Sequence, residues 1–202
     1  MIFVFPLPKV VLYPGTAQPL NIFEPRYIEM INDAVEGEVE IALAQTEPPG
    51  GDLARKGVLG HIRNVAGCGY AQLLEQRPDG TMMILLRASR KVRLDSAVDT
   101  DKPYIIAEAT TIPENVELET GNQFYLHRIL KELESWLQRN IPHPKRREEF
   151  IANMLTDQER VNTSCSLLIE DPDWQQKLLE INDLNARLKS ATALLETSAA
   201  SH

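Results

Sequence analysis

The sequence has few of the residues on which enzyme chemistry usually depends. Its 202 residues include two cysteines and four histidines, none of them at the spacing of a metal site. It has no G-x-x-x-x-G-K-[ST] loop for nucleotide phosphates, no G-x-S-x-G elbow and no H-E-x-x-H helix. We therefore expect no catalytic residues, no metal and no cofactor.

Long apolar runs and an excess of positive charge are also lacking. No stretch approaches the roughly 20 apolar residues that cross a bilayer. The apolar start, MIFVFPLPKVVLYP, contains three prolines and no basic region of the signal-peptide type. The net charge is −8, from 29 acidic and 21 basic residues, whereas nucleic acids and anionic membranes bind basic surfaces. We expect a cytoplasmic protein with neither of these as its partner.

The two cysteines, Cys68 and Cys165, follow no disulfide or metal pattern, so we expect buried, reduced thiols. The tripeptide Ser164-Cys165-Ser166 could contain a nucleophile. However, Cys165 falls on the apolar stripe of a predicted helix, which favours a packed thiol. His127 lies inside another helical pattern, which is typical of a structural or surface histidine.

The sequence is clearly divided into two halves. Up to residue 112, short apolar runs alternate with turn signals, which indicates β-strands. The predicted strands are 2–5, 10–13, 20–23, 39–45, 71–76, 82–88, 92–94 and 104–112. Pro14-Gly15 predicts a type II turn, and Arg77-Pro78-Asp79-Gly80 predicts a hairpin turn. Short, locally connected strands favour a closed or strongly curled sheet over a parallel one.

A single helix is predicted within this first half. Pro25 suits the first helical position, because its missing N–H would be unpaired there anyway. An apolar stripe follows at helical spacing, made of Tyr27, Ile28, Ile31, Ala34 and Val35. Residues 46–57 are rich in proline and glycine, which predicts a loop.

From Gly121 the apolar period becomes helical. The predicted helices cover 126–137, 150–155, 161–168, 172–181 and 184–195. Asp171-Pro172-Asp173 is a helix start signal, with a capping residue, proline at the first position and acid in the first turn. The fold class is therefore α+β, with a β-rich domain at 1–115 and a helical bundle domain at 116–202.

One basic cluster, Arg87, Arg90, Lys91 and Arg93, lies in the last predicted strands of the hairpin region. Three interpretations remain open: a solvated strand face, a patch that contacts phosphates, and a contact to an acidic partner protein. Few aromatic residues interleave with these cations, so there is little platform for stacking single-stranded bases.

The N-terminal sequence resembles a known family. The similar segments are Phe5-Pro6-Leu7-Pro8, Val11-Leu12-Tyr13-Pro14-Gly15, Pro19-Leu20 and Ile22-Phe23-Glu24-Pro25-Arg26-Tyr27. They resemble the N-terminal domain of the ATP-dependent Lon protease, in particular the stand-alone proteins built from that domain. Residues 60–92 and the last helices extend the resemblance over roughly residues 1 to 196.

The resemblance implies a PUA-like β barrel followed by a small helical bundle. It also implies that the domain recognises unfolded or client polypeptides, with a protease in trans as a further partner. The family's ATPase and Ser-Lys peptidase modules have no counterpart in this sequence, so we expect a non-enzymatic polypeptide-binding module. PUA-like barrels also serve RNA-binding proteins, and an RNA-binding protein that uses Arg87–Arg93 is the alternative.

The residues shared with the family form a signature, namely Pro14, Gly15, Phe23, Glu24, Pro25, Arg26 and Tyr27. We interpret them as mostly architectural. Phe23 would end a strand, Pro25 would begin a helix, and Glu24 or Arg26 would satisfy nearby backbone or charge. Direct contact with a ligand is the alternative.

Overall fold

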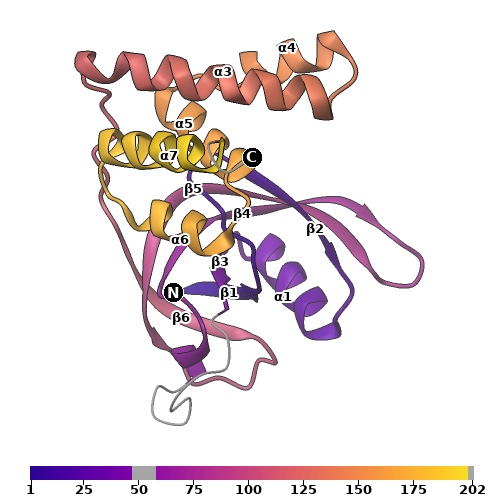
Figure 1. Cartoon of the computed structure of the whole chain (residues 1–202). Coiled ribbons are helices and arrows are strands. Elements are labelled where there is room, and N and C mark those ends of the chain that lie inside the picture. Colours follow the sequence, from indigo (N-terminus) through magenta and orange to yellow (C-terminus); the bar gives the residue numbers. More distant parts are fainter. Residues whose placement is uncertain (47–57, 200–202) are drawn as a thin grey trace. The chain divides into compact units, whose positions relative to one another are not determined.

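A computed structural model of the chain describes residues 1–46 and 58–199 (Figure 1). The chain forms two compact units, Met1–Ile112 and Pro113–His202. The predicted domain boundary at residue 115 falls close to this division, and the independence of the two domains stays a prediction. Apart from Thr46, the predicted loop 46–57 lies outside the described residues.

The first unit is a curled mixed sheet with one long helix (Figure 1). Its strands are β1 Ile2–Leu7, β2 Ala17–Ile22, β3 Ile41–Gln45, β4 Val65–Gln76, β5 Met82–Ala97 and β6 Ile105–Thr111. In the described part of the chain they are ordered β2-β5-β4-β3-β1-β6, and β5 also pairs with β6. The sheet therefore closes on itself, and β1 and β3 are its parallel pair. This confirms the predicted α+β class and the curled sheet.

The long strand β5 closes this sheet. Its first half pairs with β2 and β4, and its second half pairs with β4 and β6. Register shifts at Cys68/Gly69 and Leu94/Ser96 bend the pairings, as bulges do. The sequence predicted two strands, 82–88 and 92–94, because the polar residues between them interrupt the apolar pattern. The structure runs one strand through both.

The predicted strand at residues 10–13 is wrong, because this segment has no regular structure. Val11, Leu12 and Tyr13 are nevertheless all buried. Here the apolar run indicated burial and not strand geometry. The type II turn that follows is confirmed, since Gly15 has φ 77° and the Thr16 N–H donates to the Tyr13 carbonyl at 3.0 Å.

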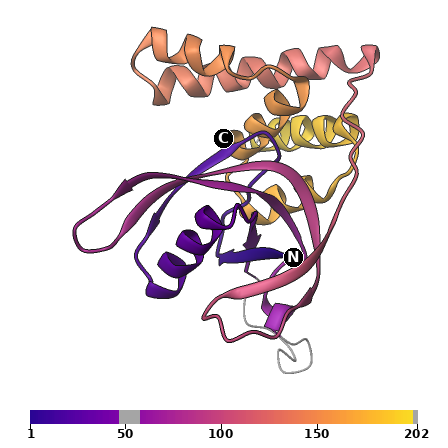
Figure 2. The same cartoon turned by 180° about the vertical axis from the view of Figure 1, so that it is seen from behind.

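Helix α1 Pro25–Glu36 packs against β1 and β4, and its place beside the sheet is clear from behind (Figure 2). Pro25 occupies the start of the helix, as predicted. The buried face consists of Tyr27, Met30, Ile31 and Ala34. The predicted stripe included Val35 and left out Met30, but the side chain of Val35 is 48% exposed.

The second unit consists of helices. Its long helices are α3 Gln123–Asn140, α4 Pro144–Ala152, α5 Asp157–Leu168, α6 Pro172–Glu180 and α7 Leu184–Ala199. Short 3-10 turns lie at η1 Val58–His61 in the first unit and at η2 Thr120–Asn122 in the second. Within the described residues, no helix combines the length and the apolar character that a bilayer span requires.

The starts of α5 and α6 follow from capping side chains. Asp171 accepts the Asp173 N–H at 2.8 Å, which confirms the predicted start signal of α6. Thr156 and Glu159 form a reciprocal capping box at the start of α5. Helix α4 ends at Ala152, earlier than the predicted limit of residue 155, and Leu155 is 79% exposed.

A buried arginine lies at the centre of the second unit. Arg187, on α7, is 1% exposed. Its guanidinium donates to the Leu178 carbonyl at 2.9 Å, to Asn162 Oδ1 at 2.7 Å and to the Ile181 carbonyl at 2.5 Å. It also forms an ion pair with Glu114. One cation therefore connects α5, α6, α7 and the segment that precedes η2.

Candidate functional site

The signature residues from Phe23 to Tyr27 lie where β2 turns into α1, whereas Pro14 and Gly15 form the turn before β2. The Arg26 guanidinium pairs with the Glu24 carboxylate at 2.7 Å and lies 4.6 Å from the centre of the Tyr27 ring. The Tyr27 ring is buried, with its centre 4.4 Å from that of Phe5. Burial raises the pKa of the Tyr27 hydroxyl, and Arg26 opposes that rise. These contacts hold the corner together, and its architectural role stays a prediction.

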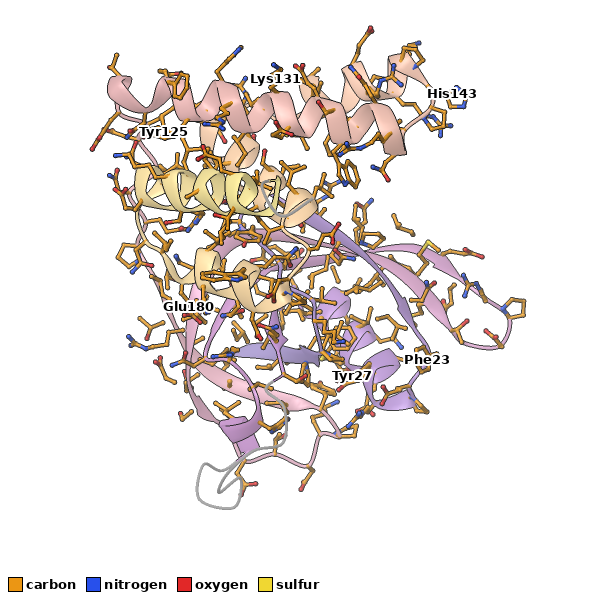
Figure 3. All side chains as sticks on the ribbon, viewed as in Figure 1. Phe23, Tyr27, Tyr125, Lys131, His143 and Glu180 are labelled. Carbon is orange, nitrogen blue, oxygen red and sulfur yellow. The ribbon has the colours of Figure 1, made fainter. Side chains whose placement is uncertain are left out.

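Phe23 is the exception among the signature residues. It is 70% exposed, just beyond the end of β2, and Figure 3 places it at the outer edge of the first unit. Tyr27, only four residues later, is 7% exposed. An aromatic ring this exposed contributes little to the core, so an architectural role does not account for Phe23.

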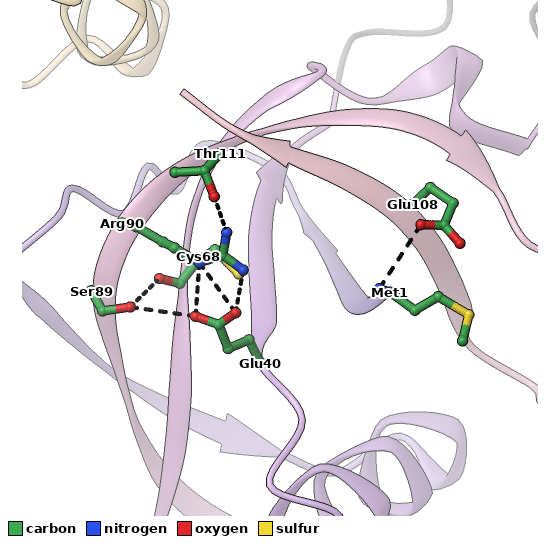
Figure 4. Close-up of polar contacts among 7 residues, drawn as sticks. All are labelled: Met1, Glu40, Cys68, Ser89, Arg90, Glu108 and Thr111. Atoms are coloured by element: carbon green, nitrogen blue, oxygen red, sulfur yellow. Dashed lines mark hydrogen bonds and ion pairs between the residues drawn. The ribbon is translucent and has the colours of Figure 1, made fainter. Parts of the chain in front are cut away.

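The four residues of the basic cluster lie on β5 in different environments. Arg90 Nε donates to Glu40 at 3.0 Å, its Nη1 bonds Thr111, and Ser89 also faces this carboxylate (Figure 4). The bond from Arg90 lowers the pKa of Glu40.

The other members of the cluster differ in how strongly they are constrained. Lys91 is 1% exposed, and Arg93 Nε donates to Asp95 at 2.8 Å. Arg87 is exposed on the strand. Since two of the guanidiniums are already paired with carboxylates and the lysine is buried, this cluster offers little charge to a phosphate.

Neither cysteine resembles a nucleophile. Cys68 and Cys165 are free and buried. Burial raises the pKa of each thiol to about 12, so both remain protonated near neutral pH. In the described part of the chain, His, Cys, Asp and Glu side chains form no group that could hold a metal ion.

The first unit contains an apolar groove between α1 and the β4–β5 hairpin, which we call the α1 groove. Its volume is about 350 Å³. It is lined by Ile31, Asn32, Val35, Glu36, Leu73 and Met82. Ile31 and Met82 form a buried floor, whereas Val35 and Leu73 are 48% and 42% exposed at the rim. The sequence did not predict this groove, because the helical pattern placed Val35 in the buried stripe. Leu73 and Leu74, two adjacent apolar residues in an otherwise polar predicted strand, were the signal that could have indicated it.

A polar cluster ties α1 to the loop before β6. Lys102 Nζ lies 3.1 Å from Glu29 and 2.5 Å from Asp33, and the Tyr104 hydroxyl donates to Asp33 at 2.5 Å. These bonds, that of Lys102 first, lower the pKa of Asp33. Burial and the neighbouring Asp33 raise the pKa of Tyr104 to about 12.

The lowered pKa of Asp33 predicts a pH-dependent contribution to stability. A carboxylate whose pKa is lower in the folded state stabilises it above the unfolded value of about 3.9. That contribution is lost as the pH falls through the folded pKa. The stability difference between the wild type and Asp33→Asn should therefore be constant from pH 7 to 5 and shrink below pH 4. Urea titrations at fixed ionic strength measure it, and a difference that stays constant down to pH 2.5 would contradict the assignment.

Together, the closed sheet, its single long helix and the following helical unit define a two-part α+β fold with an apolar groove in its first unit. Two Lon N-terminal domains are among the solved structures that share this fold. The N-terminal domain of a Mycobacterium avium complex Lon protease matches with a TM-score of 0.69 and 18% identity, covering 96% of this chain and 97% of that one. A Lon N-terminal domain protein from Xanthomonas campestris matches with a TM-score of 0.63 and 16% identity, covering 95% and 96%.

The sequence comparisons show the family. Residues 1–197 match the family model of the ATP-dependent protease La (LON) substrate-binding domain, and the chain belongs to this family. Lon protease from Parabacteroides distasonis is 28% identical over 192 residues, and that from Escherichia coli strain K12 is 25% identical over 204. The aligned regions cover 91% and 96% of this chain but 22% and 24% of those proteases.

Proposed function

We propose that this chain is a non-enzymatic polypeptide-binding module that holds unfolded or partner proteins weakly and presents them to a protease in trans. Its membership of the substrate-binding domain family carries the proposal. The α1 groove supplies an apolar surface of the kind that such binding needs. The matched family model describes a substrate-binding domain and not an ATPase or a peptidase.

The size of such a surface limits the affinity. An exposed apolar patch of about 400 Å² is common on a single domain. At about 25 cal/mol per Å², burying it yields roughly 10 kcal/mol. Association and ordering oppose this with about 4–15 kcal/mol. The small remainder corresponds to dissociation constants between micromolar and millimolar, so tight action would need several contacts at once.

The proposal predicts that the purified chain binds a reduced, alkylated and denatured protein with a dissociation constant in the micromolar range or weaker. The same protein in its native form should not bind. Apolar capture should change little between 50 and 500 mM salt, because screening acts on charges. Isothermal titration calorimetry with both forms measures this.

Total RNA is the discriminating control. Binding through phosphates would weaken steeply with salt, with a slope close to the number of phosphate contacts. Steeply salt-dependent RNA binding without binding of denatured protein would overturn the proposal in favour of the RNA-binding alternative. Nanomolar binding of one short peptide would overturn the weak-binding part of it.

A further inference from the structure

The charged residues around the α1 groove are mainly acidic, which bears on the kind of polypeptide segment that binds there. Helix α1 carries the acidic residues Glu29, Asp33 and Glu36, and Glu38 follows its end. Lys102 pairs with the first two. Among the residues that the structure describes, neither Glu36 nor Glu38 has a cationic partner, and the last turn of α1 contains no basic residue.

This arrangement is unfavourable for the isolated helix. The carboxyl end of a helix carries partial negative charge, which favours cations and disfavours carboxylates. Glu36 lies in the last turn, and Glu38 follows the cap residue Gly37. Glu38 also has φ 51°, a conformation that glycine and asparagine adopt more readily than glutamate. Two carboxylates and the helix end therefore concentrate negative potential beside an apolar groove that Glu36 itself lines.

We propose that the α1 groove binds segments of polypeptide in which an apolar side chain is followed two residues later by lysine or arginine. The apolar side chain would pack on Ile31 and Met82 between Val35 and Leu73. In an extended peptide, residues two apart lie on the same side about 7 Å from each other. A cation at that distance would reach Glu36, Glu38 and the helix end. The inference rests on the proposed function and gives it a site and a substrate class.

The groove also has the geometry for such a segment. Its lining residues come from α1 on one side and from β4 and β5 on the other, all within the first unit. Its floor is fully buried, whereas its rim is half exposed. An apolar side chain that enters the groove displaces water from the apolar lining, which favours binding. No helix or strand has to unfold to admit it.

The test uses fluorescein-labelled twelve-residue peptides and fluorescence polarisation on the full chain. A peptide that repeats Leu-Ser-Lys-Ser, with leucine and lysine two residues apart on one side, should bind at least about tenfold more tightly than one that repeats Leu-Ser-Glu-Ser at 50 mM salt. This preference should shrink at 500 mM salt. A serine and lysine peptide should bind weakly at both, because it lacks the apolar anchor.

Substitutions then locate the site. Leu73→Ser should weaken binding of the leucine and lysine peptide about tenfold. Leu155→Ser is the matched control, because Leu155 is an exposed leucine of the second unit and should not change binding. Glu36→Gln with Glu38→Gln should weaken binding about threefold to tenfold and remove the preference for lysine over glutamate. Glu148→Gln with Glu149→Gln, both exposed on α4, is the charge control.

The outcomes separate this inference from the proposed function. If denatured protein binds the wild type but the groove variants bind peptides like the wild type, the α1 groove is the wrong site and the proposed function stands. If neither denatured protein nor any peptide binds the wild type, both fail. Equal affinity for the lysine and glutamate peptides would overturn the charge argument. Circular dichroism of each variant verifies that its fold is intact.

Discussion

Replacing Arg187 with alanine should destabilise the second unit by about 3–5 kcal/mol. The side chain is 1% exposed, and four protein groups accept its hydrogen bonds. Alanine would leave the Glu114 carboxylate, itself only 9% exposed, without its cation. It would also remove the donor that Arg187 supplies to the amide oxygen of Asn162 and to the carbonyls of Leu178 and Ile181. Removing one partner of a buried pair is costly because the other charge stays buried.

The two tryptophans make this effect measurable in the second unit alone. Trp136 lies on α3 and Trp174 on α6, so tryptophan fluorescence reports the unfolding of the helices. A loss of this size should lower the urea midpoint by about 2 M, given an m-value near 2 kcal/mol/M. Arg128→Ala is the matched control, since Arg128 pairs with Glu196 while both side chains are nearly half exposed. An exposed pair contributes at most about 1 kcal/mol.

A double-mutant cycle distinguishes the buried charge from simple loss of packing. Arg187→Met keeps most of the apolar volume of the side chain, and Glu114→Gln removes the charge that Arg187 neutralises. The double variant should lose clearly less stability than the sum of the two single variants, because each single change leaves a partner unsatisfied. Additive losses would show that the ion pair is not the source of the stability.

The buried arginine also shows what a sequence pattern cannot reveal. Arg187 stands between apolar residues in a helical sequence, and the usual expectation for arginine is an exposed side chain. Its burial depends on acceptors from Glu114, Asn162, Leu178 and Ile181, which are spread over about seventy positions of the chain. Local periodicity has no access to such contacts. The helices themselves were predictable, because apolar spacing and the Asp171 cap are local signals.

The candidate site was predictable only in part, for a related reason. Pro25 and the turn at Pro14-Gly15 act through their own backbone geometry, so the sequence alone placed them. The basic cluster was predicted only because its four cations lie close together in the sequence. In the structure, Arg90 pairs with Glu40 and Lys91 is buried. The α1 groove needs a helix and a distant hairpin to meet. No short stretch of the sequence contains both the helix and the hairpin, so local patterns could not predict the groove.

Replacing Gly67 with alanine should destabilise the first unit by about 3 kcal/mol or more. A Cβ atom built on Gly67 would lie 1.9 Å from the carbonyl oxygen of Leu12 and 2.7 Å from its carbonyl carbon. Both are backbone atoms of a buried segment, so no side chain can rotate away to relieve the contact. Strand β4 would have to separate from this segment, and Gly67 pairs there with Leu43 and Lys91. Only glycine fits where the irregular residues 10–13 cross the sheet.

The closed sheet gives this substitution a wider consequence than a local clash. Because β4 connects β3 to β5, a displaced β4 weakens both pairings at once. Hydrogen exchange followed by mass spectrometry should therefore show faster exchange across β3, β4 and the centre of β5. Gly121→Ala is the control, since its Cβ would meet no atom within 4 Å, and its effect should stay within about 0.5 kcal/mol. If Gly67→Ala were as stable as Gly121→Ala, the close crossing of residues 10–13 over β4 would be refuted, and with it the physical reason for the burial of Leu12.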